Sequence, residues 1–328
     1  MTSTSPKAVQ TAQSDGGCIY SSSSVTLVRS NVSYCSTLAT SGTKGGAIYA
    51  KTAVVLNGGN AVFHSLAYSS GGEAYGGAIY APEVFVTDST VSSSQALTPG
   101  GNSFGGGITT STLFAFGSTI DNNRAAEGGG VFINTQGSGV ISESTISGNT
   151  ASECGGGVYS KYQLTLKNST IAFNHALQQD TTRSCIGGGL YSGLQAKSVT
   201  LQSTIIANNR GGPAAADFAS DFDAPSGPGN SANTISGTNN LVVVTDGGSR
   251  APPGDSLHTD PQLLPLRGNG GHTRTHALVA TSPAINHGNN SANDDNDQRG
   301  SGFARAIGTA DVGAFEFDPD VIFRNGFD

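Results

Sequence analysis

Four residues in the middle of the chain have the types that polysaccharide cleavage needs. Asp121, Arg124 and Glu127 lie close together, and Lys161 follows further along the chain. Glycoside hydrolysis requires two carboxylates that flank the scissile bond, whereas a lyase requires a basic group and a group that stabilises the enolate. These residues are the candidate catalytic set. The alternative is that they are charged turn residues that keep a β-structure soluble and protect its edges.

A second group has the types that bind metal ions. His272 and His276 stand in HTRTH, and Asp295 and Asp297 stand in NDDNDQRG. Two His and an Asp suit zinc, but this His spacing aligns side chains only on a helix, and we expect a loop there. The acidic run offers oxygen ligands for calcium but lacks the central Gly and terminal Glu of an EF-hand. We therefore expect no resident cofactor, with calcium as the alternative.

The elements that must position these residues are repeats. A motif of two Gly, a tiny residue, an aliphatic and usually an aromatic residue begins at Gly16, Gly45, Gly76, Gly105, Gly128, Gly155 and Gly187. A second motif, typified by STISGN, follows each copy, and its aliphatic centres are Val32, Val62, Val91, Ile120, Ile146, Ile171 and Ile205. Repeated motifs at a fixed period indicate a solenoid.

The period fits one turn of three short strands and three bends. Successive centres lie 25–34 residues apart. Parallel strands joined within one sheet follow right-handed connections in nearly all cases. The sequence therefore predicts an all-β, right-handed parallel β-helix of about seven to eight rungs, followed by an irregular C-terminal cap.

A polar residue comes three positions after each aliphatic centre. It is Cys, Ser or Ser in the first three repeats, and then Asn123, Asn149, Asn174 and Asn208. Stacked Asn amides hydrogen-bond to one another and to turn carbonyls, so we interpret this row as a structural ladder. The alternative is a row of ligand-binding side chains.

The four cysteines occupy related places in the repeat. Cys154 and Cys185 precede their Gly motifs by similar distances, so they are expected to face each other on adjacent rungs and form a disulfide. Cys18 and Cys35 fall in the first repeat and are the second expected pair. Disulfides form in oxidising compartments, which favours a secreted protein. Four free, buried thiols are the alternative.

Composition limits the classes of partner. The chain has 328 residues, 47 of them Gly, no Trp, and a formal net charge of −7. Its 16 Lys and Arg are scattered, so nucleic acid is an unsuitable partner. It has no apolar run long enough for a transmembrane helix, and residues 1–15 lack the apolar core of a signal peptide. We expect a leader to have been removed before Met1.

The C-terminal part carries a different pattern. Its motifs, in order, are DPQLLPLRGNGG, THAL, SPAINHG, DQRG and DVGAFEF. This order closely resembles the choice-of-anchor Q domain of secreted bacterial β-helix proteins, and the repeats resemble those of chlamydial polymorphic outer-membrane proteins. The closing VIFRNGFD, residues 321–328, resembles a tail found on secreted gammaproteobacterial proteins. The resemblance implies export and cell-surface or extracellular residence, but no shared reaction.

These observations predict three parts. Residues 1–15 are expected to be poorly ordered, residues 16–250 to form the β-helix, and residues 251–328 to cap its C-terminal end. The expected function is adhesin-like or glycan binding to an extracellular glycan or a host or cell-surface partner, by a monomer. The alternative is a polysaccharide lyase or glycoside hydrolase that acts along one face of the β-helix.

Overall fold

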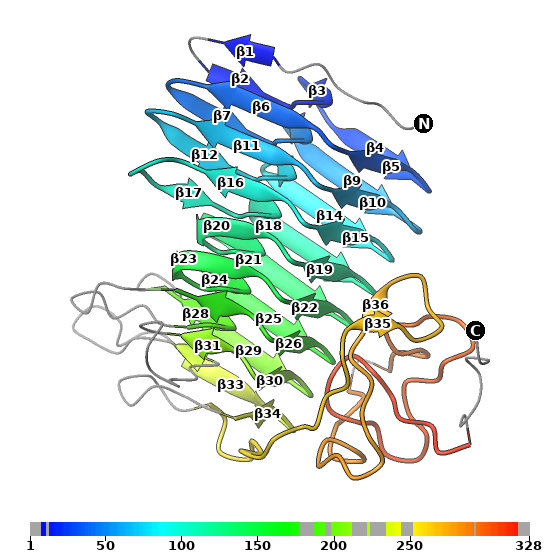
Figure 1. Cartoon of the computed structure of the whole chain (residues 1–328). Coiled ribbons are helices and arrows are strands. Elements are labelled where there is room, and N and C mark those ends of the chain that lie inside the picture. The colour runs from blue at the N-terminus through cyan, green and yellow to red at the C-terminus, as the bar shows by residue number, and fades with distance from the viewer. Residues whose placement is uncertain are drawn as a thin grey trace.

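The computed structural model describes residues 8–10, 13–177, 187–193, 198–211, 222–223, 234–243, 252–291 and 293–320. Within these ranges the protein is all-β, and its parallel strands stack into a β-solenoid (Figure 1). The predicted fold class is confirmed. The handedness and the number of rungs stay predictions.

Three parallel sheets form the sides of the solenoid in the described ranges. Sheet A contains β1 (Ala8–Gln10), β2 (Gln13–Asp15), β6 (Ser36–Ala39), β7 (Gly42–Lys44), β11 (Leu66–Ser69), β12 (Glu73–Tyr75), β16 (Gln95–Leu97), β17 (Ser103–Phe104), β20 (Arg124–Glu127), β23 (Thr150–Cys154), β27 (His175–Ala176) and β31 (Arg210–Gly211). Sheet C contains β5 (Asn31–Ser33), β10 (Ala61–Phe63), β15 (Thr90–Ser92), β19 (Thr119–Asp121), β22 (Thr145–Ser147), β26 (Thr170–Ala172), β30 (Ile205–Ala207) and β34 (Leu241–Val242).

Sheet B forms the third side and contains the longest strands. Its members are β3 (Ile19–Ser21), β4 (Val25–Val28), β8 (Ile48–Ala50), β9 (Ala53–Asn57), β13 (Ile79–Tyr80), β14 (Glu83–Thr87), β18 (Ile108–Phe116), β21 (Val131–Ser142), β24 (Val158–Ser160), β25 (Gln163–Lys167), β28 (Leu190–Ser192), β29 (Ser198–Gln202), β32 (Phe222–Asp223) and β33 (Thr234–Thr238). A separate antiparallel pair, β35 (Arg267–Gly268) and β36 (Arg274–Thr275), lies in the C-terminal segment.

The core lies inside the solenoid, where aliphatic residues stack from rung to rung. In sheet C, Val91 pairs in register with Ile120, Ile120 with Ile146, and all are buried. Sheet A contributes only small residues, as at Ala96 and Ala125. Each buried large aliphatic side chain contributes about 1.5–3 kcal/mol, so the stack supplies most of the driving force.

The paired Gly residues form the turn from sheet A into sheet B. Gly76 has a φ of 61°, a left-handed value that other L-residues rarely adopt. Its neighbour Gly77 faces the next rung so closely that an added Cβ would lie 2.2 Å from the carbonyl oxygen of Gly106. Both positions therefore require Gly, which explains why the motif recurs.

The Asn ladder runs through the interior of the bend between sheets C and A. Asn123 Nδ2 donates to Asn149 Oδ1 at 3.0 Å, and Asn149 Nδ2 donates to Asn174 Oδ1 at 2.9 Å. Backbone amides also donate to these oxygens, as from Asn123 to Asn149. The ladder thus pairs backbone groups that are buried.

The last position of the ladder differs from the predicted one. Asn174 Nδ2 donates to Asn209 Oδ1, not to Asn208, because Ile171 pairs in register with Ile206. Placing Asn208 in the ladder was wrong. Ser203 takes the turn position that Asn168 takes in the preceding rung, with φ values of 47° and 43°. The letters STI therefore stand one position earlier in this repeat than in the others, and Thr204 takes the place of Ser169.

A second ladder, which the sequence did not suggest to us, lies at the bend that precedes sheet C. The backbone N–H of Ser89 donates to Ser118 Oγ, and that of Ser118 donates to Ser144 Oγ. Ser118 and Ser144, which open their STI motifs, are therefore structural residues that each accept a hydrogen bond from the backbone of the preceding rung.

The two expected disulfides have different outcomes. Cys18 and Cys35 form a disulfide across the first rung, with Cα atoms 5.5 Å apart, so this pair is confirmed. Cys154 is buried at the end of β23, but Cys185 lies outside the described residues. The Cys154–Cys185 bridge therefore stays a prediction.

The C-terminal segment, residues 252–320, packs along the side of the solenoid (Figure 1). The described contacts cover the outer face of sheet C and the bend before it: Arg274 pairs with Asp121 at 2.6 Å, and Arg305 pairs with Glu143 at 3.0 Å. At the solenoid end, Leu257 forms a β-bridge with Leu241. The segment was expected to cap the end, whereas most of its described contacts cover a lateral face.

Candidate functional site

Aromatic rings stack on the outside of the solenoid where sheet A turns into sheet B. The rings come from two strand positions that flank the Gly turn, and their centroids lie 4.7–6.0 Å apart. This range suits stacked and edge-to-face contacts. We call this row the aromatic ladder; its members, in spatial order, are Tyr20, Tyr49, Tyr80, Tyr75, Phe104, Phe132, Tyr159 and Tyr191.

The middle of the aromatic ladder is formed by rings of sheet A, whereas both of its ends are formed by rings of sheet B. In sheet B, Tyr80 pairs in register with Thr109, which has no ring. Tyr75 of sheet A stacks on Phe104 at 5.0 Å, and Phe104 contacts Phe132 at 4.7 Å. The two sheet A rings thus bridge the gap that Thr109 leaves.

Part of the ladder is open to solvent. Phe132 and Tyr191 are only 1 % and 6 % exposed, whereas Tyr20 is 61 % exposed. Beside Tyr75 and Tyr80, a pocket of about 310 Å³ is also lined by Gln13, Ser41, Gly42, Thr43, Lys44, Glu73 and Asn134. Asn134 comes from β21, next to the irregular register of β18 and β21. We call this hollow the tyrosine pocket.

Two lysines lie against the rings. Lys44 Nζ is 5.3 Å from the centroid of Tyr80, and Lys161 Nζ is 4.9 Å from that of Phe132. Ammonium groups at such distances are attracted to the negative faces of the rings. The lysines therefore hold fixed positive charges beside the ladder.

Carboxylates stand on the same corner. The hydroxyl of Tyr75 donates to Glu73 Oε2, and Asp15 pairs in register with Lys44. Burial raises the pKa of Asp15, and the charge of Lys44 partly offsets this shift. The corner thus combines rings, hydroxyls and carboxylates.

The tyrosines of the ladder are hydrogen-bond donors. Burial raises the pKa of Tyr75 and of Tyr159 far above the ordinary value, and nearby carboxylates, including Glu127, raise both further. These phenols stay protonated at neutral pH. They suit hydrogen bonding to hydroxyl groups and are poorly suited to act as general bases.

The structure separates the four candidate catalytic residues. Glu127 lies in register with Phe104 at the ladder, and Lys161 lies over the same rings. Arg124 begins β20, the strand that Glu127 ends. Its side chain is exposed, and it lies in register with Gln95 and Thr150 of the neighbouring strands of sheet A. Asp121 is buried beneath the C-terminal segment in a bidentate pair with Arg274. Asp121 is thus a docking residue that does not face the other three.

The metal candidates are also apart. Both ring nitrogens of His276 are occupied, by Ser147 Oγ at 2.8 Å and the Leu264 carbonyl at 2.7 Å. His272 is exposed, Asp295 is exposed, and the Asp297 carboxylate pairs with Arg299. Among the described residues no group of three or more His, Cys, Asp or Glu side chains is arranged to hold a metal ion.

Sequence reasoning missed the aromatic ladder, although a signal was present. Most Gly motifs end in Tyr or Phe, and Tyr75 and Phe104 immediately precede two of them. Because neighbouring strands are about 4.8 Å apart, aromatic residues at one repeat position must stack. The tyrosine pocket had no such signal, since Asn134 reaches it from an irregular part of β21.

Comparisons with known proteins do not add a family to these observations. The chain matches no protein-family model, no curated protein and no solved structure. The resemblance of the C-terminal motifs to the choice-of-anchor Q domain therefore stays a prediction.

Proposed function

We propose that this protein is an exported, adhesin-like protein that binds an extracellular glycan at the tyrosine pocket. The observation that carries the proposal is the pocket beside Tyr75 and Tyr80, where accessible rings stand next to Lys44 and Glu73. Ligand sites combine apolar or aromatic walls with a few convergent polar groups. The proposal does not depend on a metal or a cofactor.

The chemistry of the pocket matches that of a sugar. A sugar ring presents C–H groups on its faces and hydroxyls around its rim. Tyrosine rings offer apolar area and a polar hydroxyl, so they pack against the faces while their hydroxyls contact the rim. Glu73 accepts hydrogen bonds and Asn134 both donates and accepts them, which suits neighbouring sugar hydroxyls.

The proposal of export has separate support. The Cys18–Cys35 disulfide is typical of proteins that fold in an oxidising compartment. In the part of the chain that the structure describes, no helix has the length and apolar character to cross a membrane. The motifs that resemble secreted bacterial β-helix proteins favour the same location.

Binding to a panel of immobilised neutral and acidic glycans tests the proposal. We expect the wild-type protein to bind at least one glycan and Tyr80→Ala to weaken that binding about tenfold, equivalent to about 1.4 kcal/mol. Phe114→Ala is the control, because Phe114 is an accessible aromatic residue that stacks on Phe85 at 5.2 Å, outside the ladder. Equal binding by the two variants would place the glycan elsewhere.

A polysaccharide hydrolase or lyase is the second candidate function. It is favoured by Asp15 and Glu73, two carboxyl groups near the same tyrosines, since Asp15 also raises the pKa of Tyr80. An enzyme would release reducing ends or unsaturated uronates from a polysaccharide panel, with or without calcium, and Glu73→Gln would abolish that release. Unchanged turnover in Glu73→Gln would exclude this carboxylate as a catalytic residue.

A further inference from the structure

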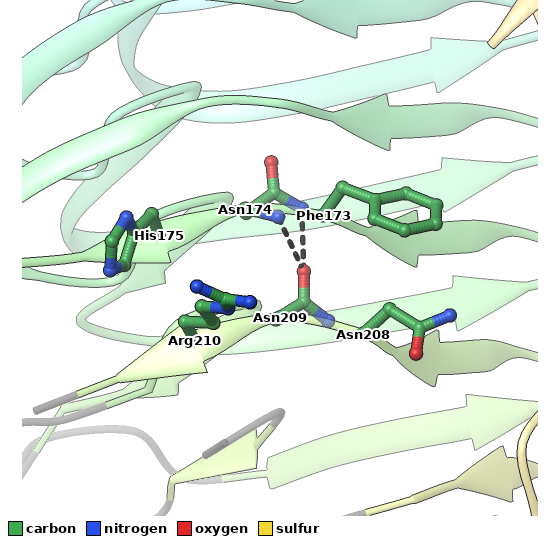
Figure 2. Close-up of a pocket in the computed structure, with 6 residues that line it drawn as sticks. All are labelled: Phe173, Asn174, His175, Asn208, Asn209 and Arg210. Atoms are coloured by element: carbon green, nitrogen blue, oxygen red, sulfur yellow. Dashed lines mark hydrogen bonds between the residues drawn. The ribbon is translucent and has the colours of Figure 1, made fainter. Parts of the chain in front are cut away.

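A second pocket lies on the outside of the bend that leads from sheet C into sheet A. Its volume is about 500 Å³, and its lining residues are Phe173, Asn174, His175, Asn208, Asn209 and Arg210. Figure 2 shows Asn174 and Asn209 joined between the two neighbouring rungs, with Phe173 and Asn208 on one side and His175 and Arg210 on the other. We call this hollow the arginine pocket.

The backbone holds the pocket walls in fixed positions. Phe173 and Asn208 have φ values of 58° and 59°, which turn the chain sharply just before each ladder Asn. Immediately after the ladder, His175 and Arg210 pair in register on adjacent strands. Every wall residue is thus next to a buried, hydrogen-bonded amide, so the pocket is formed before any ligand arrives.

One wall of the arginine pocket carries positive charge. His175 and Arg210 stand side by side, and burial and the charge of Arg210 both lower the pKa of His175. Among the described residues, no carboxylate forms an ion pair with either side chain. Arg210 therefore creates a local positive potential on a chain of net charge −7, and His175 adds to it when it is protonated.

The opposite wall is aromatic. Phe173 is 44 % exposed, and part of its ring contacts His276 at a centroid distance of 5.0 Å. Burial lowers the pKa of His276, although its hydrogen bond to the Leu264 carbonyl opposes this shift. Phe173 thus lines the pocket on the side opposite His175 and Arg210.

We propose that the arginine pocket binds an acidic sugar unit, with its ring against Phe173 and its carboxylate on Arg210 and His175. A guanidinium forms two parallel hydrogen bonds to a carboxylate, and this geometry selects for such a group. The Asn208 side chain can form a hydrogen bond with a hydroxyl group of the sugar. This assignment goes beyond the tyrosine pocket, with which the arginine pocket shares no residue.

Protonation of His175 couples this binding to pH. A bound carboxylate stabilises the protonated imidazole, so affinity rises as pH falls through the pKa of His175. Among the described register partners of His175, Arg210 on β31 is charged and stays protonated, and Thr150 on β23 is uncharged. The pH dependence of binding therefore reports on His175.

Calorimetric titration with a uronic-acid oligosaccharide and with its neutral counterpart tests the assignment on the full chain. We expect the uronic-acid oligosaccharide to bind at least tenfold more tightly at pH 5.5 than its neutral counterpart, and less tightly at pH 8. Arg210→Gln is expected to lose tenfold or more in affinity. Arg29→Gln is the matched control, because Arg29 is also exposed and belongs to another rung.

The assignment would be overturned if acidic and neutral sugars bound with equal affinity, or if the two Arg variants lost equal affinity. It would also be overturned if acetate competed for the site as strongly as the sugar, or if the affinity of the wild type did not depend on pH. A loss of uronate binding in Tyr80→Ala but not in Arg210→Gln would also overturn it, while leaving the tyrosine pocket as the glycan site. Melting temperatures equal to that of the wild type in both Arg variants show that the effects arise from the site.

Discussion

At the scale of single residues, the Asn ladder and the Gly motif fit together across the bore of the solenoid. An added Cβ at Gly130 would lie 2.9 Å from Asn149 Cγ, and one at Gly157 would lie 3.0 Å from Asn174 Cγ. Where the ladder residue is the smaller Ser, as at Ser94, the facing motif contains Ala78 instead of Gly. In the first rung both positions are Cys, and they form the disulfide.

Removing one amide from the ladder tests its contribution to stability. Asn149→Ala leaves the Asn123 N–H and the Ile120 carbonyl without their partner, and we expect a loss of about 1–3 kcal/mol in the free energy of unfolding. Asn31→Ala, an exposed position of β5, is the control and should change stability by less than about 0.5 kcal/mol. Equal denaturation midpoints for the two variants would refute the ladder.

The fit between ladder and Gly motif predicts a coupling between two substitutions. Gly130→Ala alone should destabilise the protein by about 1–3 kcal/mol, because its methyl group would lie 2.7 Å from the Gly157 carbonyl oxygen and 2.9 Å from Asn149 Cγ. In the background of Asn149→Ser, which reproduces the Ala78–Ser94 pair, the same substitution should cost less, because only the contact with the Gly157 carbonyl remains. Chemical denaturation of the double-mutant cycle measures the coupling, and additive effects would contradict it.

At this scale the sequence specified most of the structure. The spacing from aliphatic centre to polar residue identified Asn123, Asn149 and Asn174 as members of a stacked row. It failed at Asn208 because STIIANN offers two adjacent Ile and two adjacent Asn for the same place, and the structure pairs Ile206, not Ile205, with Ile171. A local pattern cannot choose between two registers that bury equally apolar residues.

At the scale of elements, a buried charge network docks the C-terminal segment onto the solenoid. Arg305 is 1 % exposed and donates to Glu143 of the bend before sheet C and to Glu316 of its own segment, each at 3.0 Å. The carbonyls of Gly313 and Asp311 accept further hydrogen bonds from Arg305. The single positive charge of Arg305 is thus paired with two carboxyl groups. If both were ionised, the buried site would carry an excess negative charge.

This excess predicts how stability depends on pH. Burial raises the pKa of Glu143 to about 8 and that of Glu316 to about 7, although Arg305 opposes both shifts. The folded protein therefore holds protons that the unfolded chain releases from about pH 4.5 upward. Stability should fall as pH rises from about 5 to 8.

Substitution of Glu143 isolates its part of this effect. Glu143→Gln should flatten the decrease in melting temperature between pH 5 and pH 8, because the neutral side chain still accepts a hydrogen bond from Arg305. Each kcal/mol corresponds to about 2–4 °C for a domain of this size class. Glu83→Gln, at an exposed position of β14, should keep the wild-type slope. The same slope in both variants would show that Glu143 is not the titrating group.

Sequence patterns could not identify this network. Asp121 had the type of a catalytic acid and His276 that of a metal ligand, yet both are buried against the other part of the molecule. Their partners, Arg274 and Ser147, lie 153 and 129 residues away in the chain. Motif spacing informs only about neighbours in the sequence or in the repeat, so contacts between solenoid and C-terminal segment need the structure.

At the scale of the whole molecule, the C-terminal segment completes the hydrophobic interior on a second side of sheet C. Ile205, Ala207 and Leu241 are buried against Leu278 and Val312, outside the solenoid bore. The rungs that carry these residues would present an apolar face to water if the segment were absent. Exposed patches of this kind promote association.

Truncation tests this dependence. A chain without residues 255–328 is expected to aggregate, because it exposes this apolar face and removes Arg274 and Arg305, the ion-pair partners of Asp121 and Glu143. Size-exclusion chromatography and circular dichroism follow the outcome. A soluble monomer with the spectrum and melting temperature of the intact solenoid would show that the segment is dispensable for folding.

The function of the whole molecule rests on the tyrosine pocket, and tyrosine fluorescence tests it most directly. The chain has no Trp and nine Tyr, and the aromatic ladder contains six of these, at positions 20, 49, 75, 80, 159 and 191. Titration with oligosaccharides should therefore give a saturable change in emission in the wild type that Tyr80→Ala loses and Phe114→Ala keeps. Emission that stays constant with every glycan of a neutral and acidic panel would contradict glycan binding at the ladder.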